Sequence, residues 1–87
     1  MRHILYFTAD WCHPCQKTRP IAEDLDRDGI IKIIFIDVDT SQELLKDYGV
    51  KSVPTFILIE DGKEIHRVTG SQTREQLMVL KDYEKTI

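Results

Sequence analysis

The stretch Ile4–Cys15, ILYFTADWCHPC, passes from an apolar run to a polar turn that carries both cysteines of the chain. Ile4–Phe7 is short and continuously apolar, which is typical of a strand buried on both faces. From residue 11 to about residue 27 apolar side chains recur at mostly helical spacing, and Asp28-Gly29 supplies a stop. The motif Trp11–Cys15 therefore lies between a central strand and the first turn of a helix.

The remainder of the chain predicts three further strands and two further helices. A second strand buried on both faces is expected over 30–38, a third over 53–59 and a fourth over 64–69, with Asp61-Gly62 as the hairpin turn between the last two. Each helix is expected to open with a capping box, in which a threonine precedes a Glu or Gln by three residues. These pairs are Thr40 with Glu43 and Thr73 with Gln76.

Three residues mark expected features of the helices. Pro20 lies inside the first helix and should kink it, because proline removes one backbone hydrogen bond. Gly49 follows the second helix, where a residue in the left-handed conformation is expected as the C-cap. Tyr83 is expected to be the last residue on the apolar face of the third helix. The predicted order is β-α-β-α-β-β-α, with helical crossovers that make the first strands parallel and a tight turn that makes the last pair antiparallel. We expect an α/β fold with a four-stranded mixed sheet flanked by three helices.

Length and composition limit the class of protein. Eighty-seven residues, 41% of them hydrophobic, leave room for one globular domain over 1–87. A formal net charge of -3 offers no basic surface to a nucleic acid, so none is expected as a partner. No apolar run approaches the roughly 20 residues of a membrane span. Asp10 follows the first apolar run too soon for a signal peptide, so we expect no membrane association and a cytoplasmic location.

Cys12 and Cys15 are placed for thiol-disulfide chemistry. A thiol at a helix N-terminus faces unpaired N–H groups and the positive end of the helix dipole, which stabilise its thiolate. Cys12 is expected to be that thiol. Cys15, one turn deeper and more shielded from water, is suited to resolve a mixed disulfide formed on Cys12.

Two other readings of the cysteines remain open at this point. A zinc ion needs four ligands, and only His3, His13 and His66 could join the two thiols. His13 lies between the cysteines, where binding the ion together with both is cramped, and His3 and His66 belong to predicted strands as surface or edge residues, so no metal is expected. The cysteines could also be inert core residues. The spacing Cys-x-x-Cys at a strand-to-helix turn favours the redox reading over both.

Several motifs in order resemble the thioredoxin family along nearly the whole chain. Trp11-Cys12-His13-Pro14-Cys15 resembles the family's Trp-Cys-Gly-Pro-Cys active site, and Pro20 matches its helix-kinking proline. Tyr48–Thr55 resembles the segment that leads into the family's cis-proline loop. Asp61-Gly62 matches the hairpin glycine, and Gly70 matches the glycine of the substrate-facing loop. The resemblance implies a thioredoxin-like fold.

The resemblance also implies a function. Cys12 would attack a disulfide of a protein substrate, Cys15 would resolve it, and a thioredoxin-reductase-like donor would reduce the pair again, without a cofactor and in a monomer. His13 and Pro14 complete the catalytic turn. The substrate would lie in a shallow groove, with the Val53-Pro54 bond cis and the backbone of Val53 paired to the substrate chain. The residues expected to bind it are Trp11, Val53, Pro54, Thr55 and Gly70.

The sequence departs from the family pattern in three places. Only eleven residues precede Cys12, so the family's N-terminal strand and helix are not expected. The family's buried acid corresponds to Tyr6, and its lysine partner corresponds to Phe35. His13 replaces a glycine. Proton transfer from Cys15 must therefore use water, His13 or another group, since a phenol is a poor base at neutral pH.

Two other functions remain as alternatives. A glutaredoxin-like reductant using glutathione fits the length. Trp11 before the first cysteine and the lone Gly70, where glutaredoxins carry paired glycines, argue against it. A non-catalytic interaction module of the same fold is the second alternative, and the presence of both cysteines weighs against it.

Overall fold

The computed structural model describes residues 1–84. It confirms the predicted order of elements and the mixed sheet with three helices. The last helix ends before Tyr83, and residues 85–87 of the predicted domain lie outside the described part. The elements are β1 (Arg2–Thr8), α1 (His13–Arg27), β2 (Lys32–Asp37), α2 (Gln42–Tyr48), β3 (Thr55–Glu60), β4 (Lys63–Thr69) and α3 (Arg74–Lys81).

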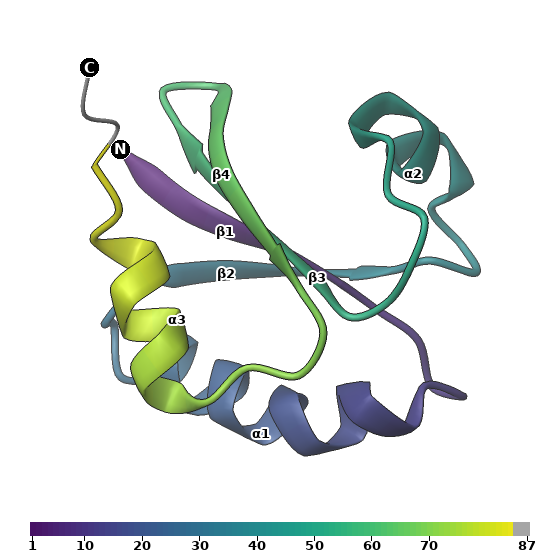
Figure 1. Cartoon of the computed structure of the whole chain (residues 1–87), viewed down its shortest axis with the longest axis horizontal. Coiled ribbons are helices and arrows are strands. Elements are labelled where there is room, and N and C mark those ends of the chain that lie inside the picture. The colour runs from purple at the N-terminus through teal and green to yellow at the C-terminus, as the bar shows by residue number, and fades with distance from the viewer. Residues whose placement is uncertain (85–87) are drawn as a thin grey trace.

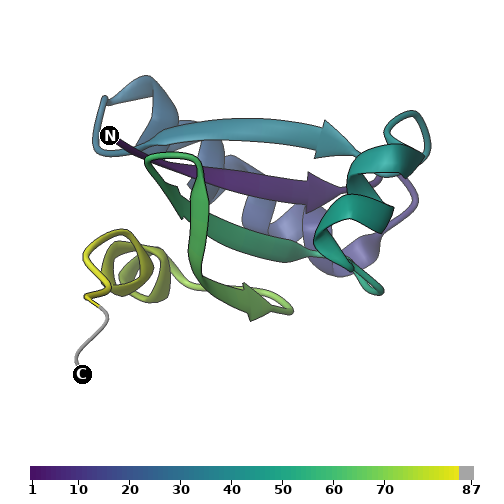
Figure 2. The ribbon, with the colours of Figure 1, turned by 90° about the horizontal axis from the view of Figure 1, so that it is seen from above.

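The strand order across the sheet is β2-β1-β3-β4. β1 and β2 are parallel, as predicted, and β3 and β4 form the predicted antiparallel hairpin. The prediction that a helical crossover makes the third strand parallel to the first is wrong, because β3 is antiparallel to β1 even though α2 joins β2 to β3. The seven residues of α2 span only about 10 Å. They lie at the end of the sheet where β1 and β2 finish, so the chain starts β3 from that same end (Figure 2).

The helices divide the core between the two faces of the sheet. α1 and α3 cover one face and α2 lies on the other (Figure 1). The cluster under α1 and α3 is built around Tyr6, Phe56 and Leu25. The cluster on the α2 face contains Phe7, Ile57 and both cysteines. β1 is therefore buried on both sides, as its apolar run predicts.

The second strand contributes to the core on both faces, through Ile33 on one side and Ile36 on the other, but it is not fully buried as predicted. β2 is an outer strand of the sheet, and its Ile34 side chain is 38% exposed. Ile33 is buried, and its backbone N–H donates to the Asp26 carboxylate of α1 at 2.9 Å. The Asp26 side chain of α1 thus accepts a hydrogen bond from a backbone N–H of the outer strand.

One of the two predicted capping boxes forms. At α3 the Thr73 hydroxyl accepts from the Gln76 N–H at 3.1 Å, and the Gln76 side chain accepts from the Thr73 N–H at 2.8 Å. At α2 the prediction is wrong, because the N-cap is Ser41 and no side chain caps the helix. The Thr40 hydroxyl instead donates to the carbonyl of Asp37 at 3.4 Å. The Thr40 hydroxyl is therefore used in the turn after β2 and does not cap α2.

The predicted turns agree with the backbone. Gly49 ends α2 with φ of 64°, a left-handed conformation that glycine adopts without steric cost. Asp61 and Gly62, at the β3–β4 hairpin, both have positive φ. α1 continues through Pro20 from His13 to Arg27.

Candidate active site

The two cysteines lie at the N-terminus of α1 and form a disulfide, with their Cα atoms 5.2 Å apart. The helix begins at His13, two residues later than predicted, which makes Cys12 its N-cap residue. The Cys12 sulfur accepts a hydrogen bond from the Cys15 N–H at 3.2 Å. A donor of the first helical turn is therefore directed at the Cys12 sulfur, where negative charge would be stabilised.

The exposure of the two cysteines differs in the predicted sense. Cys12 keeps 4% of its surface accessible and Cys15 keeps none. His13 and Pro14, between them, are exposed. A partner molecule that approaches the turn from solvent therefore meets Cys12 before Cys15.

Trp11 lies on the surface beside this turn. Its side chain is 67% exposed, which excludes a role in core packing. The indole Nε1 donates to both carboxylate oxygens of Asp39, at 3.0 and 3.3 Å. This bond to the loop after β2 fixes one edge of the ring and leaves the remainder open to a partner.

A hollow of about 220 Å³ borders Trp11. Its walls come from the loop after β2, from α2 and from the segment before β3, and Val53 contributes to them. Most of this lining is apolar. The predicted neighbours Trp11 and Val53 therefore line one hollow.

Two loops meet at the proline of the predicted groove. The Val53-Pro54 bond is cis. The N–H of Gly70 donates to the Pro54 carbonyl at 2.9 Å, and the Ser71 hydroxyl donates to the Pro14 carbonyl at 3.4 Å. The structure thus brings Pro54 and Gly70 together and joins the Gly70–Ser71 loop to the cysteine turn.

Thr55 differs from the other predicted groove residues because its side chain is buried. It is 1% exposed, and its hydroxyl donates to the Ser52 carbonyl at 2.7 Å. This bond holds the loop that carries Pro54. The Thr55 side chain is thereby used inside the protein and does not face solvent.

Tyr6 lies behind Cys15. Its hydroxyl donates to the Cys15 carbonyl at 3.1 Å, and its ring stacks on Phe56 with centroids 4.4 Å apart. Phe35 lies against the same ring at 5.5 Å. Burial raises the pKa of the Tyr6 phenol, so the group stays protonated at neutral pH. An aromatic pair fills the site at which the family resemblance expects an acid and a lysine.

Comparison with known proteins identifies the family. The model of the family described as Thioredoxin matches residues 1–82. The chain belongs to the thioredoxin family. Thioredoxin from Bacillus subtilis is 40% identical over 76 residues, which cover 85% of this chain and 73% of the relative. Thioredoxin from Staphylococcus epidermidis is 38% identical over 81 residues, covering 91% and 78%.

Solved thioredoxin structures share the fold. A mutant thioredoxin from Halobacterium salinarum superposes with a TM-score of 0.87 at 37% identity, covering 99% of this chain and 77% of that one. Thioredoxin from Fasciola hepatica gives a TM-score of 0.85 at 32% identity, covering 93% and 78%. Together with the Cys12–Cys15 pair, this makes the protein a thiol-disulfide oxidoreductase of thioredoxin type, for which disulfide-containing proteins and a reductase are the partners that the family suggests.

Some features of this thioredoxin-family site were not anticipated from the sequence. Asp39, Ser71 and Thr8 all contact or border the cysteine turn. Only the acidic ending of the second strand could have pointed to Asp39. Within residues 1–84 no group of three or more His, Cys, Asp or Glu side chains could hold a metal, and no helix is long and apolar enough to cross a bilayer.

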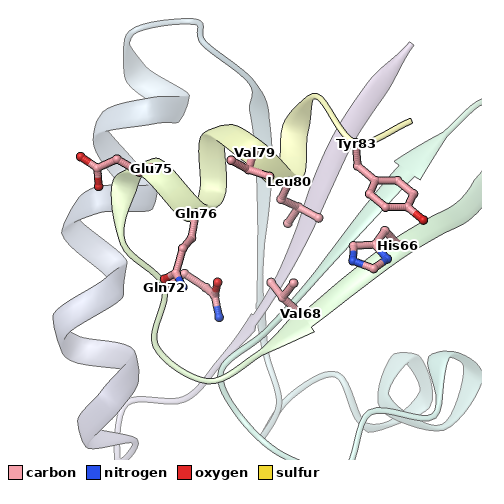
Figure 3. A pocket seen from close by; sticks show the side chains of 8 residues that line it. All are labelled: His66, Val68, Gln72, Glu75, Gln76, Val79, Leu80 and Tyr83. Atoms are coloured by element: carbon pink, nitrogen blue, oxygen red, sulfur yellow. The ribbon is translucent and has the colours of Figure 1, made fainter. Parts of the chain in front are cut away.

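A separate groove of about 340 Å³ lies between β4 and α3 (Figure 3). The rings of His66 and Tyr83 stack there in nearly parallel planes, with centroids 4.1 Å apart. None of the residues that line this groove belongs to the cysteine site. The groove is therefore separate from the cysteine site.

Proposed function

We propose that the protein reduces disulfides in other proteins, with Cys12 as the attacking thiol and Cys15 as the resolving thiol. The observation that carries this proposal is the asymmetry of the turn. Cys12 is the N-cap of α1, its sulfur accepts the Cys15 N–H, and it alone of the pair retains accessible surface. The helix N-terminus stabilises the thiolate that attack requires.

The reaction proceeds by two exchanges. The Cys12 thiolate attacks one sulfur of the substrate disulfide, which breaks that bond, forms a mixed disulfide and releases the other substrate sulfur as a thiolate that takes up a proton. Cys15 then loses its proton and attacks the Cys12 sulfur. This step forms the Cys12–Cys15 disulfide found in the structure and releases the second substrate thiolate. Two electrons have passed from the protein to the substrate.

The substrate chain is proposed to bind where the loops meet beside the turn. Trp11 and Val53 offer apolar surface, and Val53 lies two residues before β3. The backbone of Val53 would pair with the extended substrate chain. The hydrogen bond between the Gly70 N–H and the Pro54 carbonyl holds the two loops together. Thr55 contributes by fixing this loop through Ser52. His13 and Pro14 complete the exposed face of the turn.

A reductase of thioredoxin-reductase type is the proposed electron donor, and it returns two electrons and two protons to the oxidised pair. We further propose that the chain acts as a monomeric single domain in the cytoplasm. A lone Cys-x-x-Cys pair suits a compartment in which thiols are kept reduced.

A trapping experiment tests the roles of the two thiols. Cys15→Ser should accumulate a mixed disulfide with a protein substrate such as insulin, because the resolving step is lost. Cys12→Ser should form none above background. Equal rates of alkylation for the two thiols, measured across the pH range in which thiols ionise, would contradict the assignment.

Insulin reduction with different electron donors tests the alternatives. Turnover with thioredoxin reductase is expected. Turnover with glutathione alone would favour a glutaredoxin-like role, and no turnover with either donor would favour an interaction module.

A further inference from the structure

The resolving step requires Cys15 to lose a proton inside the protein, since none of its surface is accessible. A thiol attacks a disulfide only as its thiolate. The ionisable side chain bonded to the Cys15 backbone is Tyr6, which donates to the Cys15 carbonyl and stays protonated at neutral pH. The proton must therefore leave by a route that does not use Tyr6 as the base.

A cavity of about 160 Å³ reaches the resolving cysteine from the side of β1 and α1. This volume is ample for a water molecule. Its walls are formed by Thr8, Ala9, Asp10, Cys15, Gln16 and Arg19.

Thr8 is the feature of this cavity that points to an occupant. It is 3% exposed, and its hydroxyl oxygen makes no hydrogen bond of good geometry within residues 1–84. The hydroxyl lies near the Tyr6 phenol, where it opposes the rise that burial causes in the pKa of that phenol. Because Thr8 and Tyr6 are two residues apart on β1, their side chains share the sheet face that α1 covers. A buried hydroxyl is costly unless it has a partner, and a water in the adjoining cavity would supply one.

The ionisable groups that face the cavity lie on both elements. Asp10 comes from the turn after β1 and Arg19 from α1, whereas the Tyr6 phenol of β1 bonds to the Cys15 carbonyl without lining the cavity. Arg19 is held by Glu23 at 3.7 Å. Asp10 is exposed, so a proton that reaches it passes directly to solvent.

We propose that the Thr8 hydroxyl positions a water molecule in this cavity and that this water takes the proton of Cys15 during the resolving step. The inference rests on the roles proposed above for Cys12 and Cys15. The S–H bond of Cys15 breaks, its proton passes through the water to solvent, and its sulfur forms the bond to Cys12 as the substrate thiolate leaves. Thr8 is a positioning residue in this step, because it acts through the water.

The test separates attack from resolution. The reduced protein is mixed with an equimolar small aromatic disulfide whose thiolate product is coloured, so that Cys12 attack and Cys15 resolution each release one coloured thiolate. Thr8→Val keeps the shape and removes the hydroxyl, and Thr8→Ser restores it. Thr18→Val is the matched control, because Thr18 is a 1% exposed threonine of α1 whose hydroxyl donates to the Pro14 carbonyl and which does not line the cavity.

Thr8→Val should leave the first phase unchanged and slow the second at least about fivefold near neutral pH, the effect of losing one hydrogen bond to the transferring water. The difference should narrow in alkaline solution, where hydroxide removes the proton directly. Thr8→Ser should recover the wild-type rate, and Thr18→Val should not slow the second phase.

Equal second-phase rates for wild type and Thr8→Val at all pH values would overturn the proposal. Equal slowing by Thr8→Val and Thr18→Val would also overturn it, because the effect would then come from a general disturbance of α1. The absence of a second phase in the wild type would instead contradict the roles assigned to the two cysteines.

Discussion

Tyr6 connects the core to the active site through a single side chain. Its ring packs between Phe35 and Phe56, and its hydroxyl reaches the carbonyl of Cys15. The same residue therefore contributes apolar packing and one buried hydrogen bond. These two contributions can be separated, because phenylalanine retains the first and loses the second.

Tyr6→Phe should lower the free energy of unfolding by about 1 kcal/mol at neutral pH, the usual worth of one hydrogen bond. This gap in the free energy of unfolding between the wild type and the variant should shrink in alkaline solution. Burial raises the pKa of Tyr6 in the folded protein, so above about pH 10 the unfolded chain releases this proton first and wild-type stability falls. The variant lacks that loss. Urea unfolding of both proteins from neutral to alkaline pH measures the gap, and a constant gap would show that the phenol does not titrate with unfolding.

His13 should make the protein more oxidising. A protonated imidazole beside Cys12 stabilises the thiolate, which exists only in the reduced form, and this raises the reduction potential. Since His13 is exposed, His13→Gly should lower the potential by only roughly 20 mV. Equilibration with glutathione gives both values.

His13→Gln serves as the control for this measurement, because it keeps a long side chain without the charge. It should behave like the glycine variant. A His13→Gly potential equal to or above that of the wild type in acidic solution would show that the backbone of the turn, and not the imidazole charge, sets the potential.

The residues with local chemistry could be predicted from the sequence. Cys12 and Cys15 are recognisable from their spacing and from their place between a strand and a helix. The partner of the Trp11 indole could not be predicted in the same way, because Asp39 is 28 residues away and the contact depends on the packing of two loops. Thr8 was also missed, since a threonine at the end of a strand has no sequence signal that distinguishes it.

At the scale of elements, the two helices differ in how their ends are capped. α3 has side-chain hydrogen bonds at both ends, whereas α2 is capped only at its C-terminal end, by Gly49. α3 has its capping box, and at its C-terminal end Arg2 donates to the carbonyls of Lys81 and Tyr83 at 2.9 and 2.7 Å. A cation at this end also interacts favourably with the helix dipole. α2 contains no fully buried residue and has no side-chain cap at its start.

Two threonine substitutions test this difference. Thr73→Ala should lower the free energy of unfolding by about 1 kcal/mol, because it removes a working N-cap. Thr40→Ala should change it by less than about 0.5 kcal/mol, as expected for an exposed site outside such features. Chemical denaturation measures both. A larger loss at Thr40 than at Thr73 would contradict the observed caps.

The types of the elements could be predicted from the apolar periodicity of the sequence. The direction of β3 in the sheet could not. The spacing Thr40-x-x-Glu43 satisfies the capping pattern, but the turn after β2 delays the helix by one residue. The direction of β3 depends on the length and place of α2, which determine from which end the chain re-enters the sheet. Such properties depend on three-dimensional packing and are not visible in a local pattern.

At the scale of the whole molecule, the disulfide ties the active-site turn into the core cluster on the α2 face. Closing so short a loop removes limited entropy from the unfolded chain. Reduction should therefore lower the free energy of unfolding by about 2 kcal/mol. Urea unfolding with and without reductant measures the loss, and Cys12→Ser, which cannot form the bond, should show none. An equal response in that variant would mean that the reductant acts elsewhere.

The contact between Asp26 and Ile33 has a consequence for how separate copies of the protein meet. An outer strand offers unpaired backbone groups to which the strand of another molecule can add, and this is a common route to aggregation. At β2 the carboxylate already holds one of these donors, so an incoming strand would have to displace it and leave a negative charge beside the new pair. A single acidic side chain of α1 thereby helps to keep the sheet from extending into a neighbouring copy.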